Sequence, residues 1–125
     1  MKSCIIAGEG KLPILLAEKN KDFLVIAIRS LSVLSDYKNK TYLVDMLDFN
    51  EMIKIFKTHD IKKIIFAGKF YRQKNYTKNI SKEVKKIIDE TKFFGDDLTL
   101  KKIKKFFEKN GFEVVSPNTL SLIHI

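Results

Sequence analysis

Short runs of consecutive apolar residues recur along the chain, separated by stretches in which apolar and polar positions mix. The runs are rich in Ile, Val and Phe. They lack the alternation of apolar and polar residues that is found where one face of a sheet meets water. Such runs are typical of strands buried on both faces. We therefore predict strands at residues 3–7, 23–28, 41–44, 62–67 and 112–115.

The clearest amphipathic helix follows the third of these runs. Asp48 has the character of an N-cap, and Glu51 comes three residues later, as in a capping box. From there on, apolar residues recur with the i, i+3, i+4, i+7 spacing of one helix face. The residues predicted to face inward are Phe49, Met52, Ile53 and Phe56.

Further segments are predicted as helices from weaker signals. Residues 12–19 carry Pro13 in the first turn, where its missing N–H is tolerated. Residues 81–90 and 97–110 have apolar positions at helical spacing, and Gly111 follows the second of them as the expected C′ residue. In the last of these helices the inward residues are expected to be Leu100, Ile103 and Phe107.

Strands thus alternate with helices, and only the polar segment 30–40 reads as a connection with at most one helical turn. This order is typical of a parallel sheet covered by helices. A chain of 125 residues has room for one such domain. The predicted fold is an α/β, Rossmann-like, three-layer domain with a mainly parallel sheet, spanning residues 1–117. Ligands bind such sheets at the carboxyl ends of the strands. Here those ends carry Gly8-Glu9-Gly10-Lys11, Arg29-Ser30, Asp45 and Gly68-Lys69.

The first strand-to-helix turn, which contains Gly8, Gly10 and Lys11, is a candidate anion site. Small residues let the backbone approach a phosphate, and the start of a helix supplies N–H donors. A tight turn without a ligand explains the same glycines, so both interpretations stay open. NAD binding is disfavoured, because Pro13 stands where the dinucleotide fingerprint needs its third glycine and Arg29 stands where it needs an acid.

Two further motifs carry candidate chemistry. Gly68 ends another predicted strand and precedes Arg72, one of only two arginines among 24 basic residues. Arginine holds a phosphate through a planar fork that lysine lacks, although a surface arginine without a ligand is the simpler explanation. Asp96 and Asp97 precede the last long helix. Capping of that helix is the simpler explanation for this pair, and Mg²⁺ binding is the alternative.

The charge of the chain identifies no single partner. The 24 basic and 15 acidic side chains give a net charge of +9, and all but two of the basic residues are lysines. A basic balance suits nucleic acid or an anionic membrane. The lysines are spread along a chain that is also rich in Ile, Asn and Phe, so compositional bias explains them better. Nucleic-acid binding is disfavoured, because the sequence contains no legible recognition helix or aromatic platform.

Cysteine and histidine are too scarce for several other kinds of site. Cys4, the one cysteine, excludes an internal disulfide framework and is predicted to be a packed core thiol. His59 is expected at a helix end beside Asp60, where it complements the helix dipole. With only two histidines, neither a His-based metal site nor a nucleophile–His arrangement is predicted. No apolar run approaches the ~20 residues that cross a bilayer, and no export signal is evident, so a cytoplasmic location is expected.

Three segments, in this order and spacing, resemble the N-terminal domain of the UDP-2,3-diacylglucosamine pyrophosphatase family of lipid A synthesis, the LpxI type. The first is IIAGEGKLP at residues 5–13, and the second is FAGKFYR at residues 66–72. The third combines GDDLTL at residues 95–100 with GFEV at residues 111–114. Each motif alone is weak, but the ordered set is fairly specific and covers nearly the whole chain.

The resemblance implies a two-domain, cytoplasmic, Mg²⁺-dependent hydrolase. Such an enzyme splits UDP-2,3-diacylglucosamine into UMP and 2,3-diacylglucosamine 1-phosphate (lipid X), with the ligand between the domains. Its essential catalytic Asp lies in the second domain, so no catalytic residue is expected in this chain. By the same resemblance, Gly8, Gly10 and Lys11 are first-loop ligand contacts, Gly68 and Arg72 are second-loop contacts, and Asp96 and Asp97 match a Gly-Asp-Asp motif.

Members of this family are about twice as long as this chain, so the second domain is expected to be missing. The chain alone is then expected to be inactive and to supply one wall of the cleft. Exposed apolar surface is expected to favour homo-oligomers, and the lipid-linked substrate suggests peripheral contact with the inner membrane. Residues 118–125 resemble translated adaptor sequence and are expected to be an artefactual tail. The alternative function is a stand-alone nucleotide-binding or regulatory module without catalysis.

Overall fold

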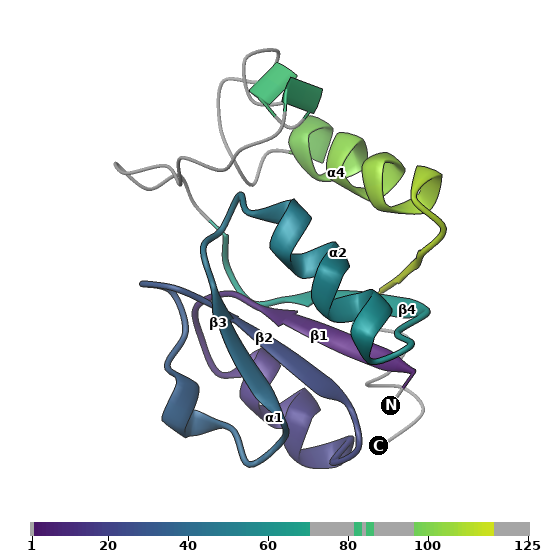
Figure 1. The fold of residues 1–125 in the computed structure, drawn as a ribbon. Coiled ribbons are helices and arrows are strands. Elements are labelled where there is room, and N and C mark those ends of the chain that lie inside the picture. The colour runs from purple at the N-terminus through teal and green to yellow at the C-terminus, as the bar shows by residue number, and fades with distance from the viewer. Residues whose placement is uncertain (1, 71–81, 84, 87–96, 117–125) are drawn as a thin grey trace.

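The computed structural model describes residues 2–70, 82–83, 85–86 and 97–116, with the backbone alone for residues 97–100. In this part of the chain, five strands form one sheet in the order β3-β2-β1-β4-β5 (Figure 1). Every neighbouring pair of strands is parallel. The strands are β1 (Ser3–Ala7), β2 (Leu24–Ile28), β3 (Thr41–Val44), β4 (Lys63–Ala67) and β5 (Glu113–Val115). The predicted α/β fold and parallel sheet are confirmed.

Helices cover both faces of the sheet and make three layers. The helices are α1 (Leu12–Lys19), α2 (Phe49–Thr58) and α4 (Asp97–Lys109), with a short 3₁₀ turn, η1 (Leu34–Asp36), in the polar connection. α2 and α4 lie together over one face, and α1 lies under the other (Figure 1). Successive side chains of a strand point to opposite faces. Cys4 and Ile6 of β1 therefore pack with the α2 layer, whereas Ile5 and Ala7 pack with the α1 layer.

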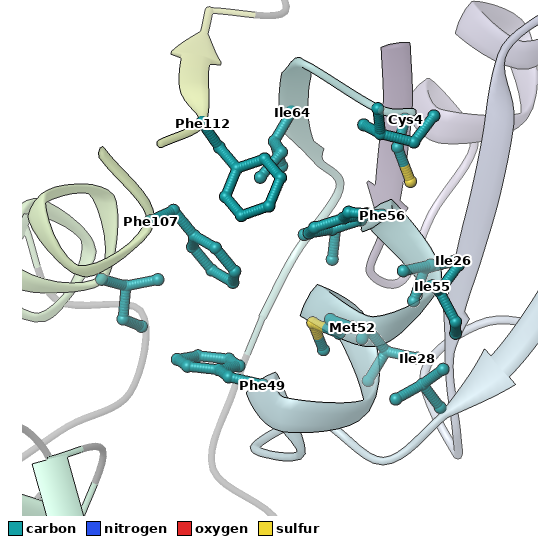
Figure 2. Packing of buried hydrophobic residues seen from close by; sticks show 14 of the residues in the cluster. Cys4, Ile26, Ile28, Phe49, Met52, Ile55, Phe56, Ile64, Phe107 and Phe112 are labelled. Carbon is teal, nitrogen blue, oxygen red and sulfur yellow. The ribbon is translucent and has the colours of Figure 1, made fainter. Parts of the chain in front are cut away.

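An aromatic cluster fills the space between α2, α4 and the sheet. Phe107 of α4 is fully buried at its centre (Figure 2). Its ring centroid lies 5.0 Å from that of Phe49 and 6.0 Å from that of Phe56, both on α2. Rings of Phe66, Phe106 and Phe112 lie 5.4–6.4 Å away on other sides. These tilted and edge-on contacts fasten α4 to both α2 and β4.

Both predicted helix starts are confirmed. The Asp48 carboxylate accepts a hydrogen bond from the Glu51 backbone N–H at 3.2 Å, which caps α2. In a full capping box the Glu51 side chain would accept from the Asp48 N–H. Here that N–H donates to the Asp45 carbonyl instead, at 3.1 Å. Asp97 is the first residue of α4.

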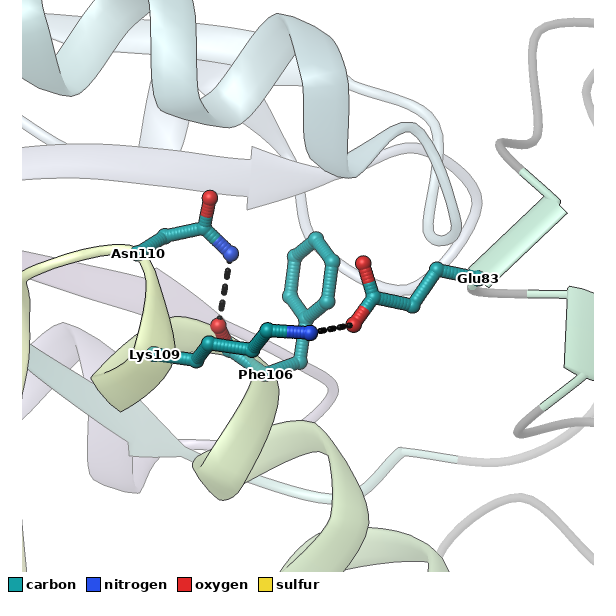
Figure 3. Close-up of polar contacts among 4 residues, drawn as sticks. All are labelled: Glu83, Phe106, Lys109 and Asn110. Carbon is teal, nitrogen blue, oxygen red and sulfur yellow. Dashed lines mark hydrogen bonds and ion pairs between the residues drawn. The ribbon is translucent and has the colours of Figure 1, made fainter.

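The end of α4 follows the predicted pattern, with Gly111 in the left-handed region at φ 95°. The Phe112 N–H bonds back to the Phe107 carbonyl at 3.1 Å, as expected for a glycine-terminated helix. The Asn110 side chain donates to the Phe106 carbonyl at 2.7 Å, and the Lys109 ammonium lies 3.2 Å from a Glu83 carboxylate oxygen (Figure 3).

Some predicted inward faces need correction. On α2, Ile53 is only partly buried, whereas Ile55 is buried beside the sheet. On α4, Phe106 is buried in addition to the predicted Ile103 and Phe107, because its ring packs 5.5 Å from Phe49. Both helices bury a wider stripe than the spacing alone indicated. The side chain of Leu100 lies outside the described residues.

Cys4 is fully buried, which confirms the predicted core thiol, and burial raises the pKa of this thiol far above its ordinary value. His59 is the C-cap residue of α2, as expected, and its Nε2 lies 2.7 Å from the Tyr42 hydroxyl oxygen.

Within the described residues, no helix is long and apolar enough to cross a membrane. Of the predicted helix at 81–90, residues 82–83 and 85–86 are described and helical, and the tail at 118–125 lies outside the described residues.

Candidate functional site

The parallel sheet brings its candidate residues to one edge. Gly8 follows β1, Arg29 follows β2, Asp45 follows β3 and Gly68 follows β4. Because all four strands point the same way, these residues lie at the same carboxyl edge. The predicted gathering of Gly8, Arg29 and Gly68 is therefore confirmed. We call this region the carboxyl edge.

The two glycine turns of the carboxyl edge are hydrogen-bonded to each other. The Gly8 N–H donates to the Ala67 carbonyl at 2.8 Å. Beyond it, Glu9 and Lys69 exchange two backbone bonds of 2.9 Å each, N–H to carbonyl in both directions. This small antiparallel bridge extends the contact between β1 and β4 past the end of the sheet. It holds the turn after β1, with Gly8, against the turn after β4, with Gly68.

This close approach explains two of the predicted ligand glycines in structural terms. A Cβ on Gly8 would lie 2.4 Å from the Lys69 carbonyl oxygen, and a Cβ on Gly68 would lie 2.8 Å from the Glu9 carbonyl oxygen. Gly68 also has φ of 95°, which favours glycine. Gly8 and Gly68 therefore serve the contact between turns, which is sufficient reason for glycine at both positions.

Gly10 differs from the other two. Its φ is 114°, yet a Cβ there would have nothing within 4 Å. It lies directly before α1, whose N-cap position is the exposed Lys11. Within the described residues, no side chain caps this first turn and no acidic residue lies in it. The backbone N–H groups at the positive end of the α1 dipole therefore lie beside the Lys11 ammonium. Together these positive groups suit an anion.

Replacing Gly68 with Ala is expected to lower the free energy of unfolding by about 1–3 kcal/mol, because a new methyl group would displace the Glu9 backbone. Gly111 gives a matched control, since it has the same φ of 95° and open space around its Cβ position. Gly111→Ala should cost only the backbone strain. Denaturant unfolding of both variants measures the difference, and equal losses would contradict the proposed contact between turns.

The chain also matches a known protein family. The family model described as the LpxI N-terminal domain matches residues 2–122. The chain belongs to the LpxI family. A comparison with curated proteins found no match. The LpxI match includes both glycine turns and all five strands, so the resemblance seen in the ordered motifs is confirmed.

The remaining LpxI motif residues are only partly placed. Arg72 and Asp96 lie outside the described residues. Asp97 begins α4, which runs for 13 residues toward the start of β5. A helix that leads into a parallel strand starts on the side of the strands' carboxyl ends. The start of α4 at Asp97 therefore lies toward the carboxyl edge, where the glycine turns also lie.

The described residues do not by themselves offer a Mg²⁺ site. Within them, no group of three or more His, Cys, Asp or Glu side chains comes together. At the carboxyl edge, the Asp45 carboxylate is 2.7 Å from Arg29 Nε and so faces a cation. Divalent ions of this kind need several oxygen ligands.

A hollow of about 350 Å³ lies away from the LpxI motifs. It is lined by Ala17, Glu18, Lys21, Tyr37, Lys38 and Asn39. These residues end α1 and precede β3, so the hollow is nearer the amino ends of the strands. The Asn39 side chain closes one wall by donating to the Ala17, Asn20 and Phe23 carbonyls at 3.0–3.3 Å. No sequence motif pointed to it.

Proposed function

We propose that this chain forms one wall of the substrate cleft of an LpxI-type pyrophosphatase. The reaction is the hydrolysis of UDP-2,3-diacylglucosamine to UMP and 2,3-diacylglucosamine 1-phosphate. The observation that carries the proposal is the start of α1 beside Gly10 and Lys11 at the carboxyl edge, which no side chain among the described residues caps. The LpxI match over residues 2–122 supports a substrate of lipid A synthesis for this proposed anion site.

The chemistry of the substrate fits this wall. A pyrophosphate presents closely spaced negative oxygens, which need N–H donors and cations. Backbone amides at the start of α1 and the Lys11 ammonium supply both, and Arg72 adds a forked cation in the proposed site. During hydrolysis a water oxygen bonds to one phosphorus while the bond from that phosphorus to the bridging oxygen breaks. The wall stabilises the charge that moves onto the departing phosphate.

The reactive groups are proposed to come from a second domain. In that arrangement this chain binds and orients the diphosphate, and the opposite wall positions the attacking water. Mg²⁺ is proposed as the cofactor, and Asp96 and Asp97 are the carboxylates that would hold it in this proposal. The proposed location is the cytoplasm, and the acyl chains of the substrate favour peripheral contact with the inner membrane. The exposed lysines of α4, Lys101, Lys104 and Lys105, support contact with anionic lipid.

Titration of the ¹⁵N-labelled chain with UDP tests this binding site by NMR. The amide signals of Gly8, Gly10 and Lys11 are expected to shift in a saturable way, because they adjoin the proposed phosphate position. Signals of Lys21 and Lys38 in the hollow between α1 and β3 serve as the internal control and should stay in place. Shifts confined to the hollow, or no shifts at all, would contradict the proposal.

A further inference from the structure

The carboxyl edge contains an ion pair that neither the glycine turns nor the LpxI motifs include. Arg29 follows β2, Asp45 follows β3, and the Arg29 Nε donates to an Asp45 carboxylate oxygen at 2.7 Å. The side chains are 57% and 42% exposed, so both can be reached from solvent. The sequence pattern placed both residues at strand ends but gave no reason for them to pair.

The backbone holds this arginine firmly at the edge. The Arg29 N–H donates to the Val44 carbonyl at 3.0 Å, which continues the contact between β2 and β3 by one residue. The next residue, Ser30, has φ of 73°, a conformation that residues other than glycine rarely adopt. Two bonds to the Ile28 carbonyl, from the Leu31 and Ser32 N–H groups at 3.0 and 2.9 Å, close the turn. The chain thus turns sharply just after Arg29.

The register of the sheet puts Arg29 next to the first glycine turn. Ala7 of β1 pairs with Ala27 of β2. Glu9 and Arg29 each lie two residues further along the chain, just beyond the ends of these two strands, which are neighbours about 4.8 Å apart in the sheet. An arginine side chain readily spans such a distance. Arg29 therefore lies beside the turn that carries Gly10 and Lys11, on the side away from Gly68.

The residue type at this position indicates what it binds. Ligands of open parallel sheets bind in the crevice outside the carboxyl ends of the strands, and Arg29 lies at such an end. A carboxylate on Nε fixes the plane of the guanidinium, and the guanidinium fork matches a phosphate in geometry. The Asp45 contact supplies that fixed plane.

We propose that Arg29 contacts a phosphate group of the bound ligand and that Asp45 is a positioning residue that orients its guanidinium. The inference rests on the proposed function for the identity of the ligand as a nucleoside diphosphate. It implies that the diphosphate lies across the ends of β1 and β2. In the competing interpretation, the pair only fastens the ends of β2 and β3 together and changes stability alone.

Calorimetric titration of the full 125-residue chain with UDP and with inorganic pyrophosphate tests the inference. Arg29→Gln is expected to weaken binding of both probes about tenfold, as for loss of a charge-assisted hydrogen bond. Arg29→Lys should fall between that variant and the unaltered chain. Lys62→Gln is the matched control, because Lys62 forms an exposed ion pair with Asp60 at 3.1 Å, just before β4 at the opposite edge. It should leave both affinities unchanged.

Variants of Asp45 separate positioning from stability. Asp45→Asn keeps an oxygen that can accept from Nε, whereas Asp45→Ala removes it. If Asp45 orients Arg29, the Asn variant binds pyrophosphate more tightly than the Ala variant, and this difference disappears when Arg29 is Gln. A fastening role predicts equal affinities in both Asp45 variants, with changes in thermal unfolding only.

The outcomes distinguish this inference from the proposed function. Unaltered affinity in Arg29→Gln, with UDP still bound by the unaltered chain, contradicts the inference and leaves the proposed function standing. Weakened affinity in Arg29→Gln, together with no release of UMP after the second domain of an LpxI-family protein is joined to the chain, supports the inference and contradicts the proposed function. Failure of the unaltered chain to bind either probe contradicts both.

Discussion

Replacing Phe107 with Ala is expected to lower the free energy of unfolding by about 3–5 kcal/mol, which is typical of a large aromatic residue removed from a core. Phe107 is fully buried and lies against five other phenylalanine rings. The five described rings are held by contacts of their own, so moving one of them into the resulting space would lose packing elsewhere. The loss should loosen α4 from α2 and β4 together.

Leu15→Ala is the control for this experiment, because Leu15 lies on α1 and is 51% exposed. Its effect should stay within ~0.5 kcal/mol, as for surface substitutions in general. Denaturant unfolding, followed by circular dichroism, measures both variants. A Phe107→Ala loss close to that of Leu15→Ala would contradict the central place given to Phe107 in the core.

The elements of this fold could be predicted because their signals are local. β1, β3 and α1 match the predicted bounds, and the Asp48 cap works through a residue three positions away. Buried strands are recognisable from uninterrupted apolar runs, as in β2, where every residue is buried. The alternation of such runs with helical segments then leads to a parallel sheet, which the strand order confirms.

Contacts between distant turns could not be predicted in the same way. The bridge between Glu9 and Lys69 depends on β1 and β4 being neighbours, although α1, β2, β3 and α2 separate them in the chain. The glycine pattern indicated a turn or an anion site. Only the geometry assigns Gly8 and Gly68 to the contact between turns, and it shows that Gly10 takes no part in that contact. The Arg29–Asp45 pair was missed for the same reason.

Burial at the flanks of helices also depends on tertiary packing. The spacing of apolar residues identified the centre of each inward face but missed Ile55 and Phe106. Ile55 is buried because α2 lies close over the sheet, and Phe106 because α2 and α4 lie side by side. The width of a buried stripe is set by how many neighbours a helix has, which a single segment does not encode.

The second large effect follows from the proposal that the catalytic site is divided between two domains. In that proposal, one wall binds the diphosphate but cannot hold an attacking water in line with the phosphorus. Losing that proximity and orientation removes about 7–11 kcal/mol of barrier lowering. Residues 1–125 alone are therefore expected to release no measurable UMP. Joining the second domain of an LpxI-family protein to this chain should restore turnover.

Arg72 gives this experiment a site-specific variant. In the joined protein, Arg72→Lys keeps the charge but loses the forked geometry, so the rate should fall by roughly tenfold or more. Lys38→Gln, on the hollow between α1 and β3, is the control and should leave the rate unchanged. An unaltered rate in Arg72→Lys would remove Arg72 from the proposed site without affecting the rest of it.

The most direct test of the account is the release of UMP from UDP-2,3-diacylglucosamine in the presence of Mg²⁺, measured for the chain alone and for the joined protein. The account predicts UMP and 2,3-diacylglucosamine 1-phosphate in equal amounts from the joined protein and none from the chain alone. Release of UMP by the purified chain alone would contradict it, because the reactive groups would then lie within these 125 residues.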